Sequence, residues 1–304
     1  MLPASKVAGQ WDFNGNKLAA TVGKSLEYFD GPNGDTAGLT LFGTTAMDVT
    51  VPDINGEPAQ VMEVPGGLSR NLGYLMTHGI SPNGGGTLVN QYTLVMDIFV
   101  ATTGPGAASL IQINSANNTD DGDLFWQGNN FGQGGGGYKG TGAFTAGAWH
   151  RVAAAYDMAA TPPRVTKYVD GIFQDDWTAN QSLDNPRRAL RPSAILFGDG
   201  DQDERRQMWV NSIQISAGAM SKSALAALGG PTAAGIPIAS APATSASVHG
   251  DLVRISWPAW AAGYVLESTS SVTEPNWAPV ASAGKMSATI VPAGPSEYFR
   301  LRKP

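Results

Sequence analysis

The clearest pattern along the chain is a series of short apolar segments separated by turn residues. Tyr92–Val100 is apolar at almost every position, which is typical of a central strand covered on both faces. Trp149–Asp157 and Val165–Val169 are two further strand candidates, and 172–174 reads as a return strand. Asp170–Gly171 lies between the last two and supplies the positive φ angles of a tight hairpin turn. These segments predict antiparallel sheets.

Other strand candidates recur at similar spacing, whereas helical periodicity is almost absent. They are 109–113, 123–126, 194–197 and 208–215. One short helix is expected over 222–228, because Ser221 can cap its start and Gly229 with its neighbours ends it. The spacing predicts an all-β fold, a two-sheet jelly-roll sandwich.

The chain is expected to hold a second, small β-sandwich module. Residues 237–247 are small and uncharged, which is the composition of a short linker, and we place the domain boundary near residue 238. The first domain then covers 1–236 and the second covers 248–304. The predicted core of the second consists of Trp257, Tyr264, Leu266, Trp277 and Phe299.

Composition supports a turn-rich globular chain. Among 304 residues there are 38 Gly and 20 Pro, and charged residues make up 14% against a usual share of about 25%. The net charge of −6 argues against nucleic acid as a partner, because no cationic excess is present to displace counterions. No apolar run reaches the ~18 residues of a spanning helix, so membrane insertion is not expected. Cysteine is absent, which excludes disulfides and thiolate metal sites.

Several motifs, taken in order, resemble a known family. They include Trp149–Val152, Lys167–Gly171, Leu196–Asp201 and Asn211–Ile215. The series resembles the laminin-G-like, concanavalin A-like jelly rolls of secreted bacterial proteins, over roughly residues 8–236. The remainder resembles a small fibronectin-III-like module.

The resemblance implies a carbohydrate-binding or adhesive module with structural calcium. It also implies a secreted or cell-surface protein whose leader is absent from this sequence, with a polysaccharide or cell-surface glycan as its partner. We expect a monomer. The fold is indicated more firmly than the function, because such sandwiches carry lectins, hydrolases, lyases and spacers alike.

Two acidic loops are candidate calcium sites. Asp199, Asp201 and Asp203 place carboxylates at alternate positions, which lets a tight loop surround a hard cation. Asp121 and Asp123 belong to the second loop. The alternative is that these acids are solvated turn residues.

Carboxylates on strands are the candidates for glycosidic chemistry. Hydrolysis of a glycosidic bond requires two carboxylates on either side of one sugar. If the chain is an enzyme, we expect its acid and base to come from Asp97, Asp123, Asp157 and Asp170. The E-x-D-x-x-E motif of retaining enzymes of this fold is absent, and a structural role for Asp97 is the main alternative.

Binding by stacking needs only exposed aromatic rings beside polar groups. Trp126 with Asn129, and Trp177 with Asp176, offer this combination in two predicted loops. Core packing is the alternative for both tryptophans. The sequence therefore predicts a calcium-stabilised glycan-binding module first, a polysaccharide-cleaving glycoside hydrolase or lyase second, and a structural spacer third.

Overall fold

The structure is a computed structural model of the 304-residue chain. It describes residues 6–15, 17–30, 35–66, 73–102, 107–116, 123–132, 138–178, 182–198, 204, 206–238, 244–257, 264–273, 275–281, 286–292, 294 and 296–302. The chain forms two compact units, Met1–Ile238 and Ala239–Pro304, which we call unit 1 and unit 2.

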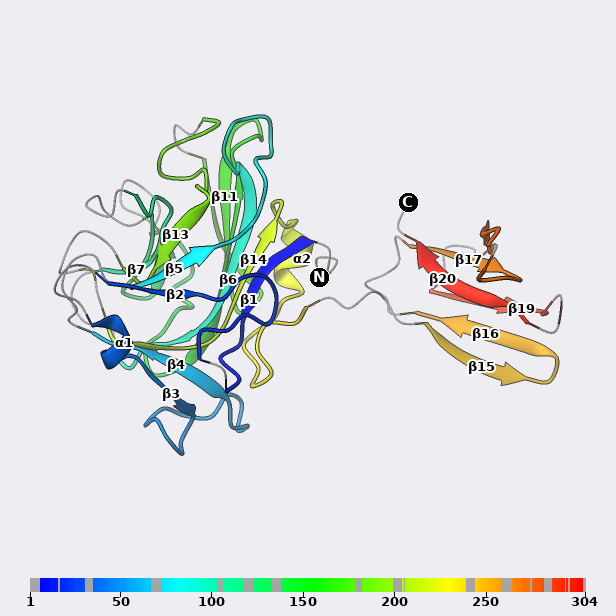
Figure 1. The fold of residues 1–304 in the computed structure, drawn as a ribbon, viewed down its shortest axis with the longest axis horizontal. Coiled ribbons are helices and arrows are strands. Elements are labelled where there is room, and N and C mark those ends of the chain that lie inside the picture. The colour runs from blue at the N-terminus through cyan, green and yellow to red at the C-terminus, as the bar shows by residue number, and fades with distance from the viewer. Residues whose placement is uncertain are drawn as a thin grey trace. The chain divides into compact units, whose positions relative to one another are not determined.

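Two antiparallel sheets make up most of unit 1 (Figure 1). The eight-stranded sheet has the order β12-β11-β10-β6-β14-β4-β3, and β1 pairs with β14. Its strands are β1 (Val7–Trp11), β3 (Leu41–Thr44), β4 (Gln60–Val64), β6 (Gln91–Phe99), β10 (Trp149–Asp157), β11 (Arg164–Val169), β12 (Ile172–Trp177) and β14 (Met208–Ala217).

The second sheet has six strands in the order β2-β5-β13-β7-β8-β9. They are β2 (Glu27–Phe29), β5 (Gly73–Thr77), β7 (Ala107–Gln112), β8 (Leu124–Gln127), β9 (Asn130–Gly132) and β13 (Ser193–Leu196). Two short helices, α1 (Thr36–Leu39) and α2 (Lys222–Ala226), complete the regular structure of unit 1. The predicted all-β sandwich is confirmed.

Strand β6 shows how the apolar pattern builds the core. It lies between β10 and β14, and every residue from Tyr92 to Phe99 is buried. Leu94 and Met96 point into the main core between the sheets, whereas Val95 belongs to a second apolar cluster on the outer face. Both faces of the strand are therefore covered, as the continuous apolar run predicts.

The outer face of the eight-stranded sheet is covered by residues 219–236, which we call the closing segment. It contains α2, whose start is capped as predicted by the Ser221 side chain, which accepts a hydrogen bond from the Ala224 N–H. Met220, Leu225 and Ile236 of this segment are buried in the same apolar cluster as Val95. The sheet is thus enclosed on both sides near its centre.

The hairpin between β11 and β12 has the predicted turn. Asp170 and Gly171 adopt φ angles of 53° and 76°, and Val169 pairs with Ile172 across the turn. These φ angles fit a two-residue hairpin turn in which both central residues are left-handed, the type that Asp-Gly favours. A register shift between Lys167 and Tyr168 then brings Thr166 opposite Asp176.

Unit 2 contains two three-stranded antiparallel sheets. One has the order β15-β16-β19, and the other has the order β18-β17-β20. The strands are β15 (Ser245–His249), β16 (Leu252–Ser256), β17 (Val265–Thr269), β18 (Ala278–Pro279), β19 (Ser287–Ile290) and β20 (Tyr298–Arg302). Trp257 and Leu266 are buried in its core and Phe299 packs against them, as the sequence predicts. Trp277 is half-buried and stands outside this core, beneath the Arg300 guanidinium.

Within the described residues, no helix has the length and apolar character that crossing a membrane requires.

Candidate functional site

A groove lies on the outer face of the eight-stranded sheet, between its strands and the start of the closing segment. It has a volume of about 360 Å³ and is lined by Ala155, Asp157, Arg164, Thr166, Ala219, Met220, Ser221 and Lys222. A space of this size accepts a small ligand such as one or two sugar rings. We call it the β10–β11 groove.

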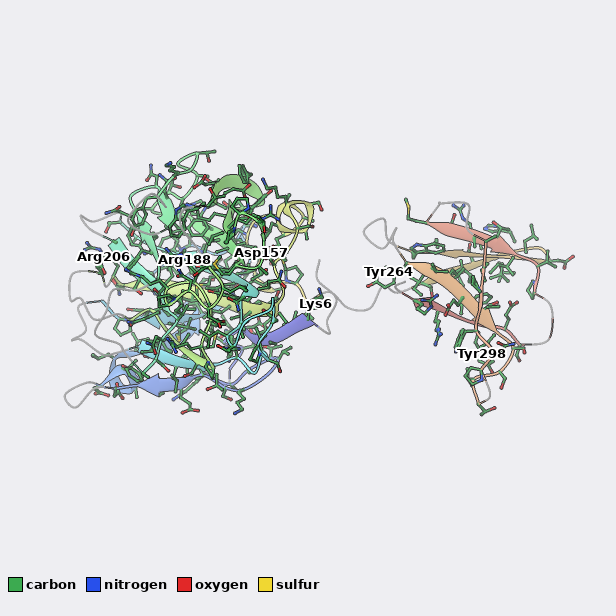
Figure 2. The ribbon with its side chains drawn as sticks, turned by 90° about the horizontal axis from the view of Figure 1, so that it is seen from above. Lys6, Asp157, Arg188, Arg206, Tyr264 and Tyr298 are labelled. Atoms are coloured by element: carbon green, nitrogen blue, oxygen red, sulfur yellow. The ribbon has the colours of Figure 1, made fainter. Side chains whose placement is uncertain are left out.

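Asp157 and Arg164 supply the charged groups at one end of this groove. They are directly opposite each other on β10 and β11. The Gln91 side-chain amide donates to Asp157 Oδ1 at 2.9 Å, and the Arg164 guanidinium lies 4.0 Å from Oδ2. The Arg164 side chain is 50% exposed. The Asp157 side chain, labelled in Figure 2, is 17% exposed, so a partly buried acceptor stands beside an exposed set of N–H donors.

Asp176 lies next to the groove and fixes two of its lining residues. The Thr166 hydroxyl donates to Asp176 Oδ1 at 2.7 Å, and the Lys222 ammonium contacts Oδ2. Partial burial opposes ionisation of Asp176, but the hydrogen bonds from Lys222 and Thr166 outweigh it and hold its pKa below the usual value. Asp176 is therefore an anion at neutral pH, and its contacts join β12 to β11 and to the closing segment.

An exposed aromatic side chain borders the Lys222 side of the groove. Phe173, near the start of β12, is 41% exposed. The Lys222 ammonium lies 4.6 Å from the centre of the Phe173 ring, so it joins this aromatic ring to the Asp176 carboxylate. The ring edge also contacts Tyr168.

The two tryptophans singled out by the sequence do not contribute to this groove. Trp126 is completely buried in the core and contacts Phe144, so it has no exposed ring for stacking. Trp177 is half-buried, packs against the core, and has the Arg188 guanidinium 4.0 Å from its ring centre. Because successive strand residues face opposite sides of a sheet, Trp177 points inward where Asp176 points outward.

Asn129, the fourth candidate binding residue, belongs to another part of unit 1. It is exposed in the turn between β8 and β9, at the edge of the six-stranded sheet, and its carbonyl accepts a hydrogen bond from the Phe144 N–H at 3.2 Å. The structure therefore places Asp176 beside the groove, and Trp126, Trp177 and Asn129 elsewhere.

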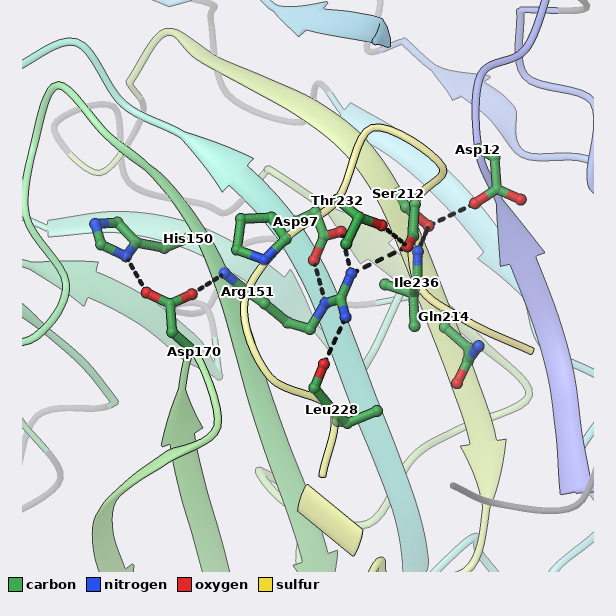
Figure 3. Close-up of polar contacts among 12 residues, drawn as sticks. Asp12, Asp97, His150, Arg151, Asp170, Ser212, Gln214, Leu228, Thr232 and Ile236 are labelled. Atoms are coloured by element: carbon green, nitrogen blue, oxygen red, sulfur yellow. Dashed lines mark hydrogen bonds and ion pairs between the residues drawn. The ribbon is translucent and has the colours of Figure 1, made fainter. Parts of the chain in front are cut away.

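Asp97 is fully buried beneath the closing segment (Figure 3). Its two carboxylate oxygens accept hydrogen bonds from Nε and Nη2 of Arg151, each at 2.7 Å. Burial raises the pKa of Asp97 to about 6, although the Arg151 hydrogen bonds and charge act in the opposite direction. The geometry is that of a structural ion pair, which was the alternative considered for this residue.

Asp170 and His150 form a separate pair at the β11–β12 turn (Figure 3). His150 Nδ1 lies 2.7 Å from Asp170 Oδ2, and the Arg151 main-chain N–H donates to Oδ1 at 2.8 Å. His150 Nε2 lies 3.1 Å from the hydroxyl and main-chain atoms of Thr145. These contacts join the turn to the loop that precedes β10.

Asp123 lies inside the sandwich and is only 5% exposed. The Ile113 main-chain N–H donates to Oδ2 at 2.8 Å, and Arg187 Nε donates to Oδ1 at 3.3 Å. Burial raises the pKa of Asp123 to about 6 against the effect of these donors. Both oxygens of Asp123 thus accept hydrogen bonds from protein N–H groups inside the fold.

The other candidate calcium ligands, Asp121, Asp199, Asp201 and Asp203, lie outside the described residues. Within the part of the chain that the structure describes, no three acidic or histidine side chains are grouped so as to hold a metal ion.

The sequence interpretation identified Asp157 and Asp176 but missed Arg164, Thr166 and Lys222. Alternation along β11 places Arg164 and Thr166 on one face, and that signal was present in the sequence. The pairing of Thr166 with Asp176 was not present there, because it depends on a register shift between Lys167 and Tyr168, without which the turn would place Thr166 opposite Asp175. The position of Lys222 was not present either, because it depends on how the closing segment crosses the sheet.

Comparisons with known proteins show a resemblance of fold. No family model matches the chain, and no curated protein matches it. The binding domain of Paraclostridial Mosquitocidal Protein 1 is 12% identical, with a TM-score of 0.50 over 91% of this chain and 63% of that one. This chain thus corresponds to somewhat less than two thirds of that domain, and at such identity the likeness concerns the fold.

Two weaker structural similarities have TM-scores of 0.46. Domain 4 of AbnA, a GH43 extracellular arabinanase from Geobacillus stearothermophilus solved in complex with arabinotriose, is 16% identical and matches over 74% of this chain and 98% of that one. The receptor binding domain of botulinum neurotoxin type G is 10% identical and matches over 97% of this chain and 66% of that one.

Proposed function

We propose that the protein is a glycan-binding module and that an oligosaccharide binds in the β10–β11 groove. The observation that carries this proposal is the pair of Asp157 and the exposed Arg164, which line a groove of about 360 Å³ side by side. Sugars present neighbouring hydroxyl groups, each of which both donates and accepts hydrogen bonds. A carboxylate beside a guanidinium suits this pattern, because the carboxylate accepts a hydrogen bond from one hydroxyl and the guanidinium donates to the next.

The remaining groups of the groove fit the same ligand. Thr166 and Lys222 are held in place by Asp176, so little side-chain entropy is lost when a ligand arrives. Met220 and the two alanines that line the groove provide apolar surface for the C–H faces of a sugar ring. The groove thus combines a few fixed polar groups with a small apolar floor, as ligand sites commonly do.

The surroundings of the candidate acids favour binding over cleavage. Asp97 pairs with Arg151, Asp123 with Arg187, and Asp170 with His150. Asp157 is the one of the four that lines the groove, and glycosidic hydrolysis requires a second carboxylate facing the same sugar. The Asp176 carboxylate beside the groove is engaged by Thr166 and Lys222. The binding domains that share the fold are consistent with a module of this kind.

Affinity measurements on the full chain test this function. We expect a glycan array to identify a bound oligosaccharide, and calorimetry to show that Arg164→Ala and Asp157→Asn each weaken its binding by tenfold or more. Arg254→Ala, a change at an exposed arginine of β16 in unit 2, is the matched control and should leave the affinity within twofold.

The proposal is contradicted if no glycan is retained, or if all three variants bind equally well. Mass spectrometry of the same mixtures separates binding from cleavage, because released oligosaccharides would show that the chain is an enzyme. We further propose a secreted or cell-surface location, since a glycan ligand of this size is encountered there.

A further inference from the structure

Strand β20 of unit 2 places three large polar side chains on one face. Its residues alternate, so that Phe299 and Leu301 pack against the core while Tyr298, Arg300 and Arg302 point outward. Tyr298, labelled in Figure 2, is 41% exposed, and the side chains of Arg300 and Arg302 are 44% and 48% exposed. We call this surface the arginine face.

A single carboxylate holds both arginines. Glu267 lies directly opposite Arg300 on the neighbouring strand β17. Arg300 donates from Nε to Glu267 Oε2 at 2.9 Å, and Arg302 donates from Nε to Oε1 at 2.6 Å. Two positive charges therefore share one negative charge, and the face keeps a net charge of +1.

The Arg300 guanidinium is also fixed by stacking. It lies 4.3 Å from the centre of the half-buried Trp277 ring. Its remaining N–H donors are held in a defined plane, as bidentate recognition of carboxylate or sulfate groups requires. Arginine donors along one strand at alternate positions are spaced by about 7 Å.

Charge is distributed unequally between the two units. Unit 2 carries five basic and four acidic residues, whereas unit 1 carries fourteen basic and twenty-one acidic residues. The net charge is +1 for unit 2 and −7 for unit 1. A polyanion is therefore repelled by unit 1 as a whole, and the arginine face is the place where it meets fixed positive charge.

A groove lined by hydroxyl groups, an amide and one carboxylate adjoins one end of this face. It has a volume of about 540 Å³, and its lining includes Thr269, Asn276, Ser296 and Glu297. Thr269 lies directly opposite Tyr298 in the β17–β20 register. The groove, which can hydrogen-bond neutral hydroxyl groups, is thus followed along the surface by the Tyr298 ring and then by the two guanidinium groups.

We propose that the arginine face binds an acidic polysaccharide through its carboxylate or sulfate groups. Arg300 and Arg302 pair with acidic groups of the polymer, and Tyr298 with the adjoining groove contacts the neighbouring sugar. This site is separate from the β10–β11 groove and rests on different residues. A chain with both sites would hold a polysaccharide surface by two linked contacts.

Retention of the full chain on immobilised heparin and on polygalacturonate tests the proposal, since the first polymer carries sulfate as well as carboxylate and the second carries carboxylate alone. We expect at least one of them to bind at 50 mM NaCl. Arg302→Gln should reduce that affinity by fivefold or more, and it leaves Arg300 to neutralise Glu267 so that the fold is kept. Arg300→Lys, which keeps the charge but loses the planar donors, should also reduce it.

Arg254→Gln, which removes an exposed positive charge from the other sheet of unit 2, is the control and should change the affinity less than twofold. Equal loss in Arg254→Gln and Arg302→Gln would overturn the proposal, because it would indicate general charge attraction. Failure of both polymers to bind would overturn it as well. Arg164→Ala in unit 1 should leave this binding intact, so the result does not depend on the β10–β11 groove.

Discussion

Asp97 and Arg151 form a bidentate ion pair between neighbouring strands, in a region closed to solvent. They are directly opposite each other on β6 and β10, and both carboxylate oxygens are engaged at 2.7 Å. The remaining Arg151 donors reach the carbonyl groups of Leu228 and Gly235 at 2.8 and 3.0 Å. The pair therefore anchors the closing segment to the sheet and, through it, one wall of the β10–β11 groove.

Breaking this pair should destabilise unit 1 strongly. Arg151→Met leaves the buried Asp97 carboxylate without its partner, and we expect a loss of roughly 3–5 kcal/mol in the free energy of unfolding. The double variant Arg151→Met with Asp97→Leu removes both charges and should recover much of that loss. Urea denaturation measures both. A single variant as stable as the wild type would contradict the anchoring role.

Asp123 should make the stability of unit 1 fall as the pH rises through the acidic range. Burial raises its pKa from 3.8 in the unfolded chain to about 6 in the fold. Between these two values the folded state keeps a proton that the unfolded state has released, so the free energy of unfolding decreases with increasing pH. Asp123→Asn lacks this dependence.

The difference in stability between wild type and Asp123→Asn should therefore shift by roughly 2 kcal/mol between pH 4 and pH 7. Urea denaturation at several pH values measures it. A constant difference would show that Asp123 titrates normally in the fold.

The strands and the hairpin turn were predictable because their signals are local. An apolar run predicts the β6 strand, and Asp170–Gly171 predicts the positive φ angles of the turn between β11 and β12. Whether a tryptophan side chain points into the core or toward solvent is not determined by its neighbours in the sequence. Trp126 is followed by polar residues yet is buried, because the β8 strand pairs with β7 and β9 and faces the core.

Trp177→Phe should separate folding from ligand binding. The ring packs against the core and under Arg188, so the change should cost about 1–3 kcal/mol of stability. Because the side chain faces away from the β10–β11 groove, the affinity for the oligosaccharide should stay within twofold. Calorimetry and thermal unfolding of the same sample check both. A tenfold loss of affinity in a folded variant would restore Trp177 as a binding residue.

Gly171→Ala should destabilise the hairpin and displace the closing segment. Gly171 has a φ of +76°, and a Cβ atom there would lie 2.6 Å from the Ala226 carbonyl oxygen. Positive φ and a backbone clash together should cost roughly 1–3 kcal/mol. Thermal unfolding measures the change. Gly250→Ala is a matched control at another left-handed turn, with φ of +61° and no atom near the added Cβ. It should cost less.

Calcium binding by the acidic residues Asp121, Asp199, Asp201 and Asp203 remains a prediction of the sequence. A bound ion stabilises the folded state by mass action. If these residues hold calcium, EDTA should lower the melting temperature, and added Ca²⁺ should restore it while Mg²⁺ should not. A melting temperature that is the same in EDTA and in Ca²⁺ would rule the site out. Asp123→Asn should not alter the calcium effect, because its oxygens face Ile113 and Arg187.

The groove itself could be predicted from the sequence only in part. Asp157 was identified at the end of a predicted strand and Asp176 in a polar stretch, but the register that places Asp176 opposite Thr166 includes a shift between Lys167 and Tyr168 that the turn does not set. The wall formed by Met220 and its neighbours depends on contacts across the sheet between residues about 60 positions apart. Such contacts arise from packing of the closing segment against the sheet, and no pattern of neighbouring residues predicts them.

The position of Met220 offers the most direct test of the proposed binding site. Its side chain lines the β10–β11 groove and is 5% exposed, whereas Met47 is 80% exposed on another part of unit 1. With ¹³C-methyl-labelled methionine, we predict that adding the bound oligosaccharide shifts the Met220 methyl signal in a saturable way and leaves the Met47 signal unchanged. A saturable interaction in which Met220 does not shift would contradict binding in this groove.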